Sequence, residues 1–156
     1  PRRGLNFVTR KITHSLARIL SGHEKKINLG NISTRRDWGH SKDYVRAIWL
    51  ILQHKKADDF VISTGKNYSI KDFIIKVFKL INLDWKKFVT INNKKFLRPA
   101  EVRSLQGDSS KARKLLKWKP QYNLDDLCKD MLTSDLKLYG MNLDEAKKIA
   151  KKLSNK

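Results

Sequence analysis

Apolar side chains recur at helical spacing in several separate stretches of the chain. In residues 6–20 they form one continuous stripe, made by Phe7, Val8, Ile12, Leu16, Ile19 and Leu20. Gly22 follows this stripe and is the residue type that most often ends a helix. Residues 42–54 show the same period after Ser41, a typical capping residue, with an apolar face of Val45, Ile48, Trp49 and Leu52. We predict an amphipathic helix in each stretch, with Trp49 as a packing residue.

Three later helices are predicted by a capping side chain that has an acidic residue three positions further on. This capping-box pattern occurs at Ser69 with Asp72, at Asn123 with Asp126 and at Asn142 with Glu145. Behind the first of them, apolar residues at positions 73, 74, 77, 78 and 81 follow the helical period. A shorter helix is predicted over residues 108–116, ahead of the Trp-Lys-Pro sequence at residues 118–120.

Short apolar runs between these helices predict β-strands. They lie at residues 27–30, 59–63 and 88–91, and we expect the second to be mostly buried and to end at Gly65. An alternation of strands and helices is typical of an α/β or α+β architecture. The sequence contains no repeat and no Gly/Ser linker, so we predict one unit over residues 1–140 and a Lys-rich helix or tail over residues 141–156.

The 156-residue chain is long enough for one domain or for part of a larger one. Its one cysteine, Cys128, sits in an apolar helical period, which predicts a buried structural thiol and suits a reducing cytoplasm. The longest apolar run, residues 47–52, is far shorter than a membrane span, and no leader sequence is visible. Because the chain begins with Pro1 rather than Met, we expect a fragment of a longer cytoplasmic protein.

Patterns that would allow this chain to catalyse a reaction by itself are absent from its sequence. A dinucleotide site needs glycines clustered between a strand and a helix, whereas the seven glycines here are dispersed. No tyrosine precedes a lysine by four positions, the spacing that places both on one helix face in short-chain dehydrogenases. The four histidines are scattered, which argues against a zinc site. We therefore predict a binding surface with no catalytic residue.

The net charge of +20 favours a polyanion or a phosphate-bearing partner. Lysines and arginines are spread along the chain, with the largest excess in residues 146–156. A basic nucleic-acid-binding module would carry such a charge, and its affinity would fall steeply with salt. A small phosphate-bearing ligand explains the same charge with fewer assumptions. On charge alone, both classes stay open.

Four sequence blocks resemble the GDP-mannose 4,6-dehydratase family. Residues 1–12 are similar to the segment after its catalytic strand, and residues 60–69 to a strand and the helix entry behind it. Residues 98–120 carry patterns similar to its C-terminal signature, although two of these recur in many nucleotide-sugar epimerases and dehydratases. The run Arg-Asp-Trp-Gly-His at residues 36–40 is narrower and points to this family. Arg103 departs from the pattern, because the family usually has Asp there.

This resemblance implies an α/β fold, the C-terminal substrate-binding lobe of an extended short-chain dehydrogenase, with the N-terminal Rossmann half mostly missing. That half holds the family's glycine-rich NADP loop and its Thr/Glu and Tyr/Lys pairs. The family converts GDP-mannose to GDP-4-dehydro-6-deoxymannose with tightly held NADP. Hydride leaves C4, a carboxylate assists loss of water across C5 and C6, and the hydride returns to C6. This piece would bind GDP-mannose, need the missing half to catalyse, and form a dimer or tetramer at full length.

The resemblance also implies roles for single residues. Arg3 matches a family position that contacts NADP, where a planar guanidinium can pair with phosphate or stack on a base. Val8 and Lys11 lie three positions apart and hence on one helix face, where they can line the nucleotide pocket and meet the diphosphate. Arg36 and Arg98 are further candidates for diphosphate or ribose contacts.

Glu101 completes the set of implied ligand contacts, since its carboxylate can accept a hydrogen bond from a sugar or ribose hydroxyl. For the rest of the central motif we predict structural roles, with carboxylates that hold the loop and cap the helix above a packed tryptophan. These residues are Asp37, Trp38, His40, Lys42 and Asp43.

Other interpretations of the sequence stay open beside the dehydratase one. Another nucleotide-sugar epimerase or dehydratase shares this kind of lobe, and a basic nucleic-acid-binding module fits the charge. A truncated paralogue that docks on a full-length subunit fits the missing half. If the chain is a fragment, strands such as residues 60–63 lack their neighbours, and we expect it to fold poorly alone.

Overall fold

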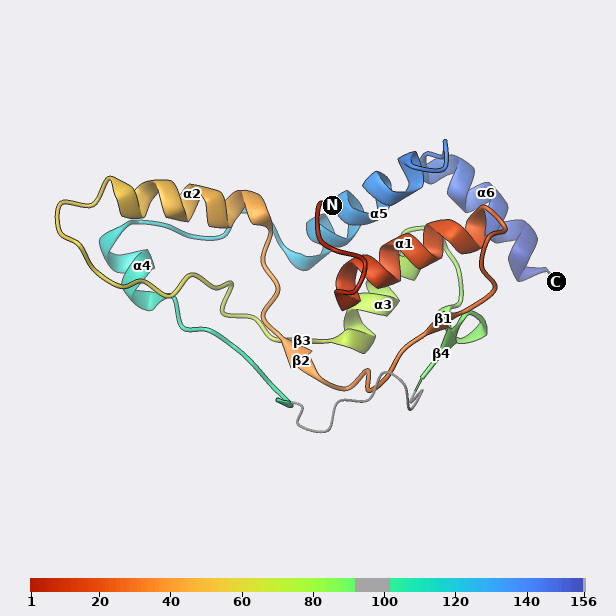
Figure 1. Cartoon of the computed structure of the whole chain (residues 1–156), viewed down its shortest axis with the longest axis horizontal. Helices are drawn as coiled ribbons and strands as arrows, with labels where there is room; N and C mark the ends of the chain where they lie inside the picture. Colours follow the sequence, from red (N-terminus) through yellow and green to blue (C-terminus); the bar gives the residue numbers. More distant parts are fainter. Residues whose placement is uncertain (92–101, 156) are drawn as a thin grey trace.

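The computed structural model describes residues 1–91 and 102–155. The helices in these ranges are α1 (Val8–Leu20), α2 (Ser41–Leu52), α3 (Ile70–Lys79), α4 (Ser110–Leu115), α5 (Leu124–Lys137) and α6 (Leu143–Ser154), with a 3₁₀ turn, η1 (Trp85–Lys87). The strands are β1 (Ile27–Asn28), β2 (Arg35–Arg36), β3 (Tyr68–Ser69) and β4 (Val89–Thr90). Figure 1 shows α1, α3, α5 and α6 gathered at one end of the molecule and α2 with α4 at the other.

The main hydrophobic core lies between α1, α3, α5 and α6. Each of these helices has one apolar face, and packing the faces together removes them from water. Ile12 of α1, Phe73 of α3 and Leu132 of α5 are completely buried. Ala146 and Ala150 are also buried, which brings α6 close to α1 and α5. The Lys-rich C-terminal stretch is therefore a folded part of the core.

Two short strand pairs lie beside this core. β1 runs parallel to β4, with Ile27 opposite Val89, and β2 runs antiparallel to β3, with Arg36 opposite Tyr68. The predicted strand at residues 27–30 is thus confirmed in its first two residues, and the one at residues 88–91 in its central two. No pattern in the sequence indicates β2 or β3, because a two-residue strand is too short to show an alternation of apolar and polar side chains.

Capping residues set the beginnings of three helices as predicted. Ser69, Asn123 and Asn142 each accept backbone N–H groups of the first turn, while the acidic residue three positions on accepts the N–H of the capping residue itself. At the end of α1, Gly22 has φ +80°, a left-handed conformation that glycine adopts without strain.

The cap of α2 differs from the predicted one. Ser41 is the first residue of the helix, and His40 caps it by accepting the N–H of Lys42 on Nδ1 at 3.2 Å. A neutral imidazole nitrogen has the lone pair that this bond needs, and His40 is buried and so held in place. The prediction of Ser41 as the cap is wrong by one residue.

A second, smaller hydrophobic cluster lies between α2 and α4 (Figure 1). Its buried residues are Ala47, Ala112, Leu116 and Trp118. Phe60 and Ile62 pack against it, but residues 59–63 join no strand ladder within the described chain. The predicted buried strand is therefore wrong. The segment is extended, it has no neighbouring strand to bond with, and Val61 remains 57% exposed.

The predicted apolar face of α2 exists but points into solvent. Val45, Ile48, Trp49 and Leu52 are between 57% and 75% exposed, so the prediction of Trp49 as a packing residue is wrong. α2 instead contacts the small cluster through Ala47 on its opposite side. In the part of the chain that the structure describes, no helix is long and apolar enough to cross a membrane.

We expect the two clusters to differ in local stability in the isolated chain. The larger core closes around four helices, whereas the α2–α4 end has few buried apolar side chains and an unpaired extended segment. Native-state hydrogen exchange followed by NMR should find the amides of α1, α3 and α5 protected. Those of α2 and residues 59–63 should exchange at least tenfold faster. Equal protection at both ends would contradict this division.

Cys128 on α5 offers a chemical test of the main core. The predicted buried thiol is confirmed, and its burial raises its pKa from 9.0 to about 12. At pH 8 the folded chain should therefore not react with DTNB, while the chain in urea should react completely. Since the folded state keeps this proton to a higher pH than the unfolded state, the associated stability should be lost as pH rises above about 9.

A matched control moves the thiol along the same helix. In a Cys128→Ala, Leu138→Cys variant the thiol stands at the exposed end of α5 and should react in the folded state. Fast reaction of the native Cys128 at pH 8 would mean that the core is open in solution.

Candidate functional site

Asp37 ties the Arg-Asp-Trp-Gly-His run to two distant loops. Its carboxylate accepts hydrogen bonds from Thr64 N (3.0 Å), the Thr64 hydroxyl (2.5 Å) and Gly65 N (2.9 Å), and a longer one from Gly107 N (3.4 Å). Bonds to an ionised acceptor are stronger than neutral ones. Burial, together with the charge of Asp37, raises the pKa of the Tyr44 phenol, which stays protonated at neutral pH. The structural role predicted for Asp37 is confirmed.

Gly107 lies where two of these loops touch. A Cβ atom at this position would come within 2.5 Å of Ser63 Cβ, so the two segments approach this closely because residue 107 is a glycine. The hydroxyl of Ser109 donates to the Ser63 carbonyl oxygen at 3.0 Å and adds a second link. The Gly-Asp-Ser-Ser-Lys stretch at residues 107–111 thus contributes to the scaffold around Asp37.

Asp43 makes a second tie between distant segments. It is 2% exposed, and its carboxylate accepts the N–H groups of Gln121 and Tyr122 at 3.0 Å. Its carbonyl oxygen accepts Nε1–H of Trp118, also at 3.0 Å. The role is structural as predicted, but Asp43 joins α2 to the segment after α4 and does not cap the helix.

Trp38 and His40 of the same run are held by aromatic contacts. The Trp38 ring tilts against Phe73 of α3 with ring centroids 5.4 Å apart, and His40 stacks on Tyr122 at 4.4 Å. His40 Nε2 also lies 3.2 Å from an Asp130 carboxylate oxygen. The aromatic and acidic members of the run are therefore engaged in holding the fold, as predicted.

Three of the predicted ligand-binding residues come together at the N-terminal end of α1. The Arg3 guanidinium lies over the Phe7 ring, 4.0 Å from its centroid, and its side chain is exposed. Val8 begins α1 and packs against the main core. Lys11 follows one turn later, with its N–H donated to the Phe7 carbonyl oxygen. Within the described chain, the first turn of α1 contains no acidic residue and has no side-chain cap, so this helix end and these cations together favour an anion.

Arg36 lies on β2 and contacts the segment that follows residues 92–101. Its Nη1 donates to the carbonyl oxygens of Arg35 at 2.7 Å and of Val102 at 2.8 Å. It thereby holds residue 102 beside β2. Arg98 and Glu101 lie outside the described residues, and their roles stay predictions.

A buried ion pair joins α1 to α5, and nothing in the sequence indicates it. Arg10 Nε lies 2.6 Å from one carboxylate oxygen of Asp135, and the Thr13 hydroxyl donates to the other, also at 2.6 Å. Arg10 and Asp135 are 125 positions apart, so no spacing rule within a helix or a motif could have paired them.

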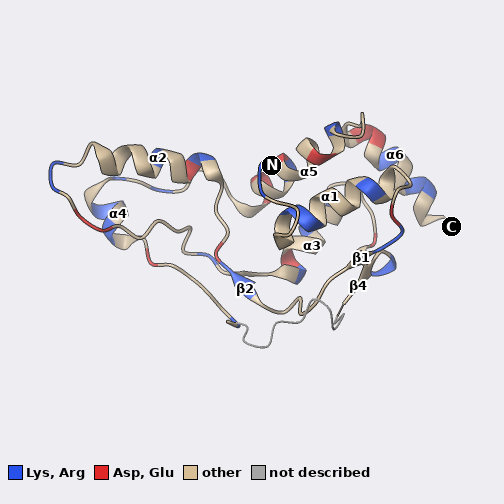
Figure 2. Cartoon of the chain, in the orientation of Figure 1, with Lys and Arg blue, Asp and Glu red and all other residues tan. Residues whose placement is uncertain are grey.

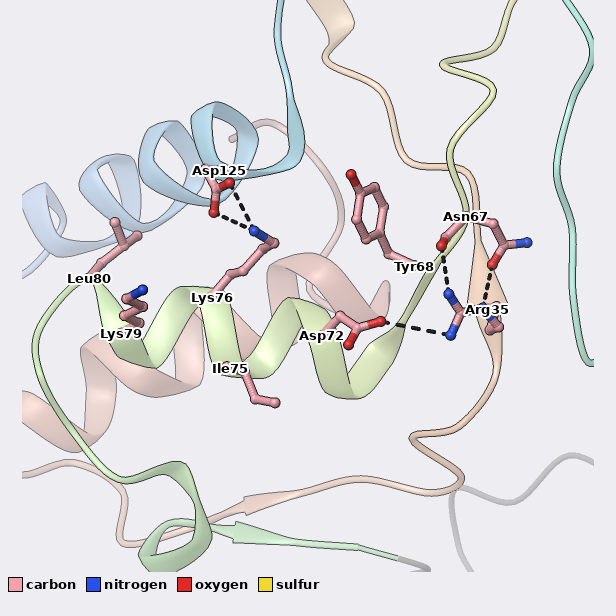
Figure 3. A pocket seen from close by; sticks show the side chains of 9 residues that line it. All are labelled: Arg35, Asn67, Tyr68, Asp72, Ile75, Lys76, Lys79, Leu80 and Asp125. Atoms are coloured by element: carbon pink, nitrogen blue, oxygen red, sulfur yellow. Dashed lines mark hydrogen bonds and ion pairs between the residues drawn. The ribbon is translucent and has the colours of Figure 1, made fainter.

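An open pocket of about 800 Å³ lies between β3, α3 and α5 (Figure 3). Its lining charges pair with each other: Lys76 with Asp125 at 2.7 Å, and Arg35 with Asp72 at 3.9 Å. Within the described chain, none of the predicted ligand contacts lines this pocket. Because its charges are largely compensated, this pocket suits a diphosphate poorly.

The positive charge is spread over the whole molecule. Figure 2 shows lysines and arginines on helices at both ends of the described chain. Nucleic-acid-binding domains usually concentrate basic side chains in one patch or stripe. The distribution therefore favours the small phosphate-bearing ligand over a polynucleotide.

The sequence is similar to those of known proteins of one family. A family model described as GDP-mannose 4,6 dehydratase matches residues 1–131. GDP-mannose 4,6 dehydratase 2 of Arabidopsis thaliana is 49% identical over 138 residues, which cover 88% of this chain and 37% of that protein. The human GDP-mannose 4,6 dehydratase is 43% identical over 159 residues, covering 91% of this chain and 42% of that protein. The chain thus spans about two fifths of the length of these relatives.

Solved structures share the fold at low sequence identity. RMD from Pseudomonas aeruginosa, complexed with NADPH, superposes with a TM-score of 0.79 at 18% identity, over 88% of this chain and 45% of that one. A dTDP-glucose 4,6-dehydratase from Bacillus anthracis, in complex with NAD, has a TM-score of 0.72 at 16% identity, over 93% and 44%. The predicted α/β fold, part of an extended short-chain dehydrogenase, is confirmed.

Loss of the Asp37 charge should loosen the loops that it holds. In an Asp37→Asn variant we expect the Thr64 and Gly65 amides to lose about 2 kcal/mol of protection, the size of a hydrogen bond to a charged group. That corresponds to about 30-fold faster hydrogen exchange. Asp59→Asn is the matched control, because Asp59 is exposed, and it should change protection by less than about 0.5 kcal/mol. An equal loss of protection in the two variants would show that Asp37 does not hold these loops.

Proposed function

Because this chain belongs to the GDP-mannose 4,6-dehydratase family, we propose that it is the GDP-mannose-binding part of such an enzyme. The whole protein would convert GDP-mannose to GDP-4-dehydro-6-deoxymannose and water with bound NADP, in the cytoplasm. The observation that carries this proposal is the family match over residues 1–131, which includes both the N-terminal end of α1 and β2.

The cations at the N-terminal end of α1 support binding of the substrate diphosphate. Lys11 and the N-terminal end of the helix dipole offer positive charge at the same end of α1. Val8 supplies an apolar surface beside them. Arg36 would contribute a further contact from β2, and Arg98 and Glu101 would complete the site as diphosphate or ribose and sugar contacts.

The surroundings of Arg3 fit a contact with NADP. The side chain is exposed, and within the described chain it makes no ion pair, so its planar fork is available to a phosphate or a base. The Phe7 ring lies beneath the guanidinium, with its centroid 4.0 Å from the central carbon of that group. NADP, when bound, supplies the acceptor and donor of hydride, while this chain orients cofactor and substrate.

The exposed apolar face of α2 supports the proposal that a second part of the enzyme packs against it. Val45, Ile48, Trp49 and Leu52 follow one another at the spacing of a single helix face. Apolar rows of this kind usually mark an interaction surface. The relatives are more than twice as long as this chain, so we propose that their nucleotide-binding part covers this face. Assembly of the full-length protein into a dimer or tetramer belongs to the same proposal.

The direct test is a chimera in which the preceding part of the Arabidopsis relative is joined to Pro1. We expect NADPH binding and, with GDP-mannose, a product lighter by one water in mass spectrometry. A panel of other nucleotide sugars separates this function from that of a related epimerase or dehydratase lobe. A chimera that folds, binds NADPH and prefers another nucleotide sugar would overturn the substrate assignment.

Two neighbouring arginines on β2 give a matched pair of variants in this chimera. Arg36→Ala should weaken GDP-mannose binding at least tenfold, the typical cost of losing a charge-assisted contact. Arg35→Ala should leave this affinity nearly unchanged, because Arg35 contacts Asn67 and Asp72 at the pocket between β3, α3 and α5. Isothermal titration with GDP-mannose measures both affinities.

The same variants test the nucleic-acid alternative. A basic nucleic-acid-binding module would keep a salt-sensitive affinity for polynucleotide in Arg36→Ala, and it would show no response to GDP-mannose. That pair of results would replace the dehydratase proposal.

A further inference from the structure

Asp135 of α5 is a carboxylate buried without any access to water. It is 0% exposed, and its two oxygens are taken by Arg10 Nε and the Thr13 hydroxyl, both at 2.6 Å. A buried charge is costly unless it is paired and hydrogen-bonded. Here both conditions are met, so Asp135 and Arg10 are locked in one geometry relative to each other.

The other side of the Arg10 guanidinium faces the N-terminal segment. Nη1 donates to the carbonyl oxygens of Pro1 and, at 3.0 Å, of Arg3. The segment between these carbonyls carries the Arg3 side chain over the Phe7 ring. The contacts thus run without a break from a fully buried carboxylate on α5, through Arg10, to the backbone of an exposed residue.

Stability alone does not account for this arrangement. A buried ion pair usually contributes little more to folding than well-packed apolar side chains of the same size. What apolar residues cannot reproduce is the direction of the guanidinium fork, which points at two specific carbonyl oxygens. A site residue on a segment without regular secondary structure needs this kind of support to be presented in one position.

We propose that Asp135 and Arg10 are positioning residues for the cofactor contact made by Arg3. Asp135 orients Arg10, Arg10 clasps the carbonyl oxygens of Pro1 and Arg3, and the clasp presents the Arg3 guanidinium to a phosphate or base of NADP. This inference rests on the proposed function and extends it to two residues that do not touch the cofactor themselves.

The test uses the chimera with its cofactor. Asp135→Asn should raise the Kd for NADPH about tenfold, the lower end of what loss of a supporting residue costs at metal sites. The KM for GDP-mannose should change less than the Kd for NADPH, because the Arg36 contact on β2 does not depend on Arg10. Glu24→Gln, which breaks the Arg18–Glu24 pair at the far end of α1, is the control and should leave the NADPH affinity unchanged.

A double variant separates positioning from stability. Arg10→Met with Asp135→Leu replaces the ion pair by apolar side chains and should restore the melting temperature, while the Kd for NADPH stays about tenfold raised, as for a lost supporting residue. Recovery of both quantities would show that the pair only stabilises the fold, and would overturn the inference.

Tryptic cleavage after Arg3 reports on the same segment without cofactor. It should be slow in the unmodified chimera and faster in Asp135→Asn and in the double variant, because the clasp is gone. Unchanged cleavage and unchanged NADPH affinity would overturn the positioning role and leave the proposed function intact. An unmodified chimera that folds but binds no NADPH would overturn the proposed function, and this inference with it.

Discussion

The capture of backbone N–H groups by two carboxylates, Asp37 and Asp43, is the interaction on which the arrangement of this molecule depends. α2, α4 and the extended segment beside them share a small apolar cluster of their own and contribute little to the main core. Their attachment comes from Asp37, which holds Thr64, Gly65 and Gly107, and from Asp43, which holds residues 121–122. Such ties are directional, so they place segments without burying both of their faces.

The four-helix core and the α2–α4 end therefore differ in how completely their apolar side chains are buried. The four-helix core fixes α1, and Arg3 is exposed beside the N-terminal end of this helix. The α2 end keeps an apolar row exposed that a stable independent domain would bury. The chain spans about two fifths of the length of its relatives, and this exposed row is where we propose that the remainder of the enzyme packs.

The net charge of the chain does not by itself locate a binding site. A value of +20 for 156 residues suggests a polyanion, yet the cations are distributed over both ends. In the pocket beside α3 they are matched by carboxylates. We propose that the functional share of the charge is the small group at the end of α1 and on β2. Net charge affects solubility and the rate at which charged partners associate, whereas a binding site depends on the positions of a few side chains.

The sequence by itself determined the features that obey local rules. Capping boxes at Ser69, Asn123 and Asn142, the burial of Cys128 and the family motif at residues 36–40 can all be read from neighbouring positions, because their physics acts within a few residues.

Only the tertiary structure decided which face of a helix meets the core and which distant groups pair. The apolar row of α2 has the pattern of a buried face, but the described residues leave it exposed. Residues 59–63 read as a strand, but no neighbouring strand bonds to them in the described chain. The Arg10–Asp135 pair joins residues 125 positions apart. Burial and pairing are set by partners that are remote in the sequence or outside this chain, and no local pattern contains that information.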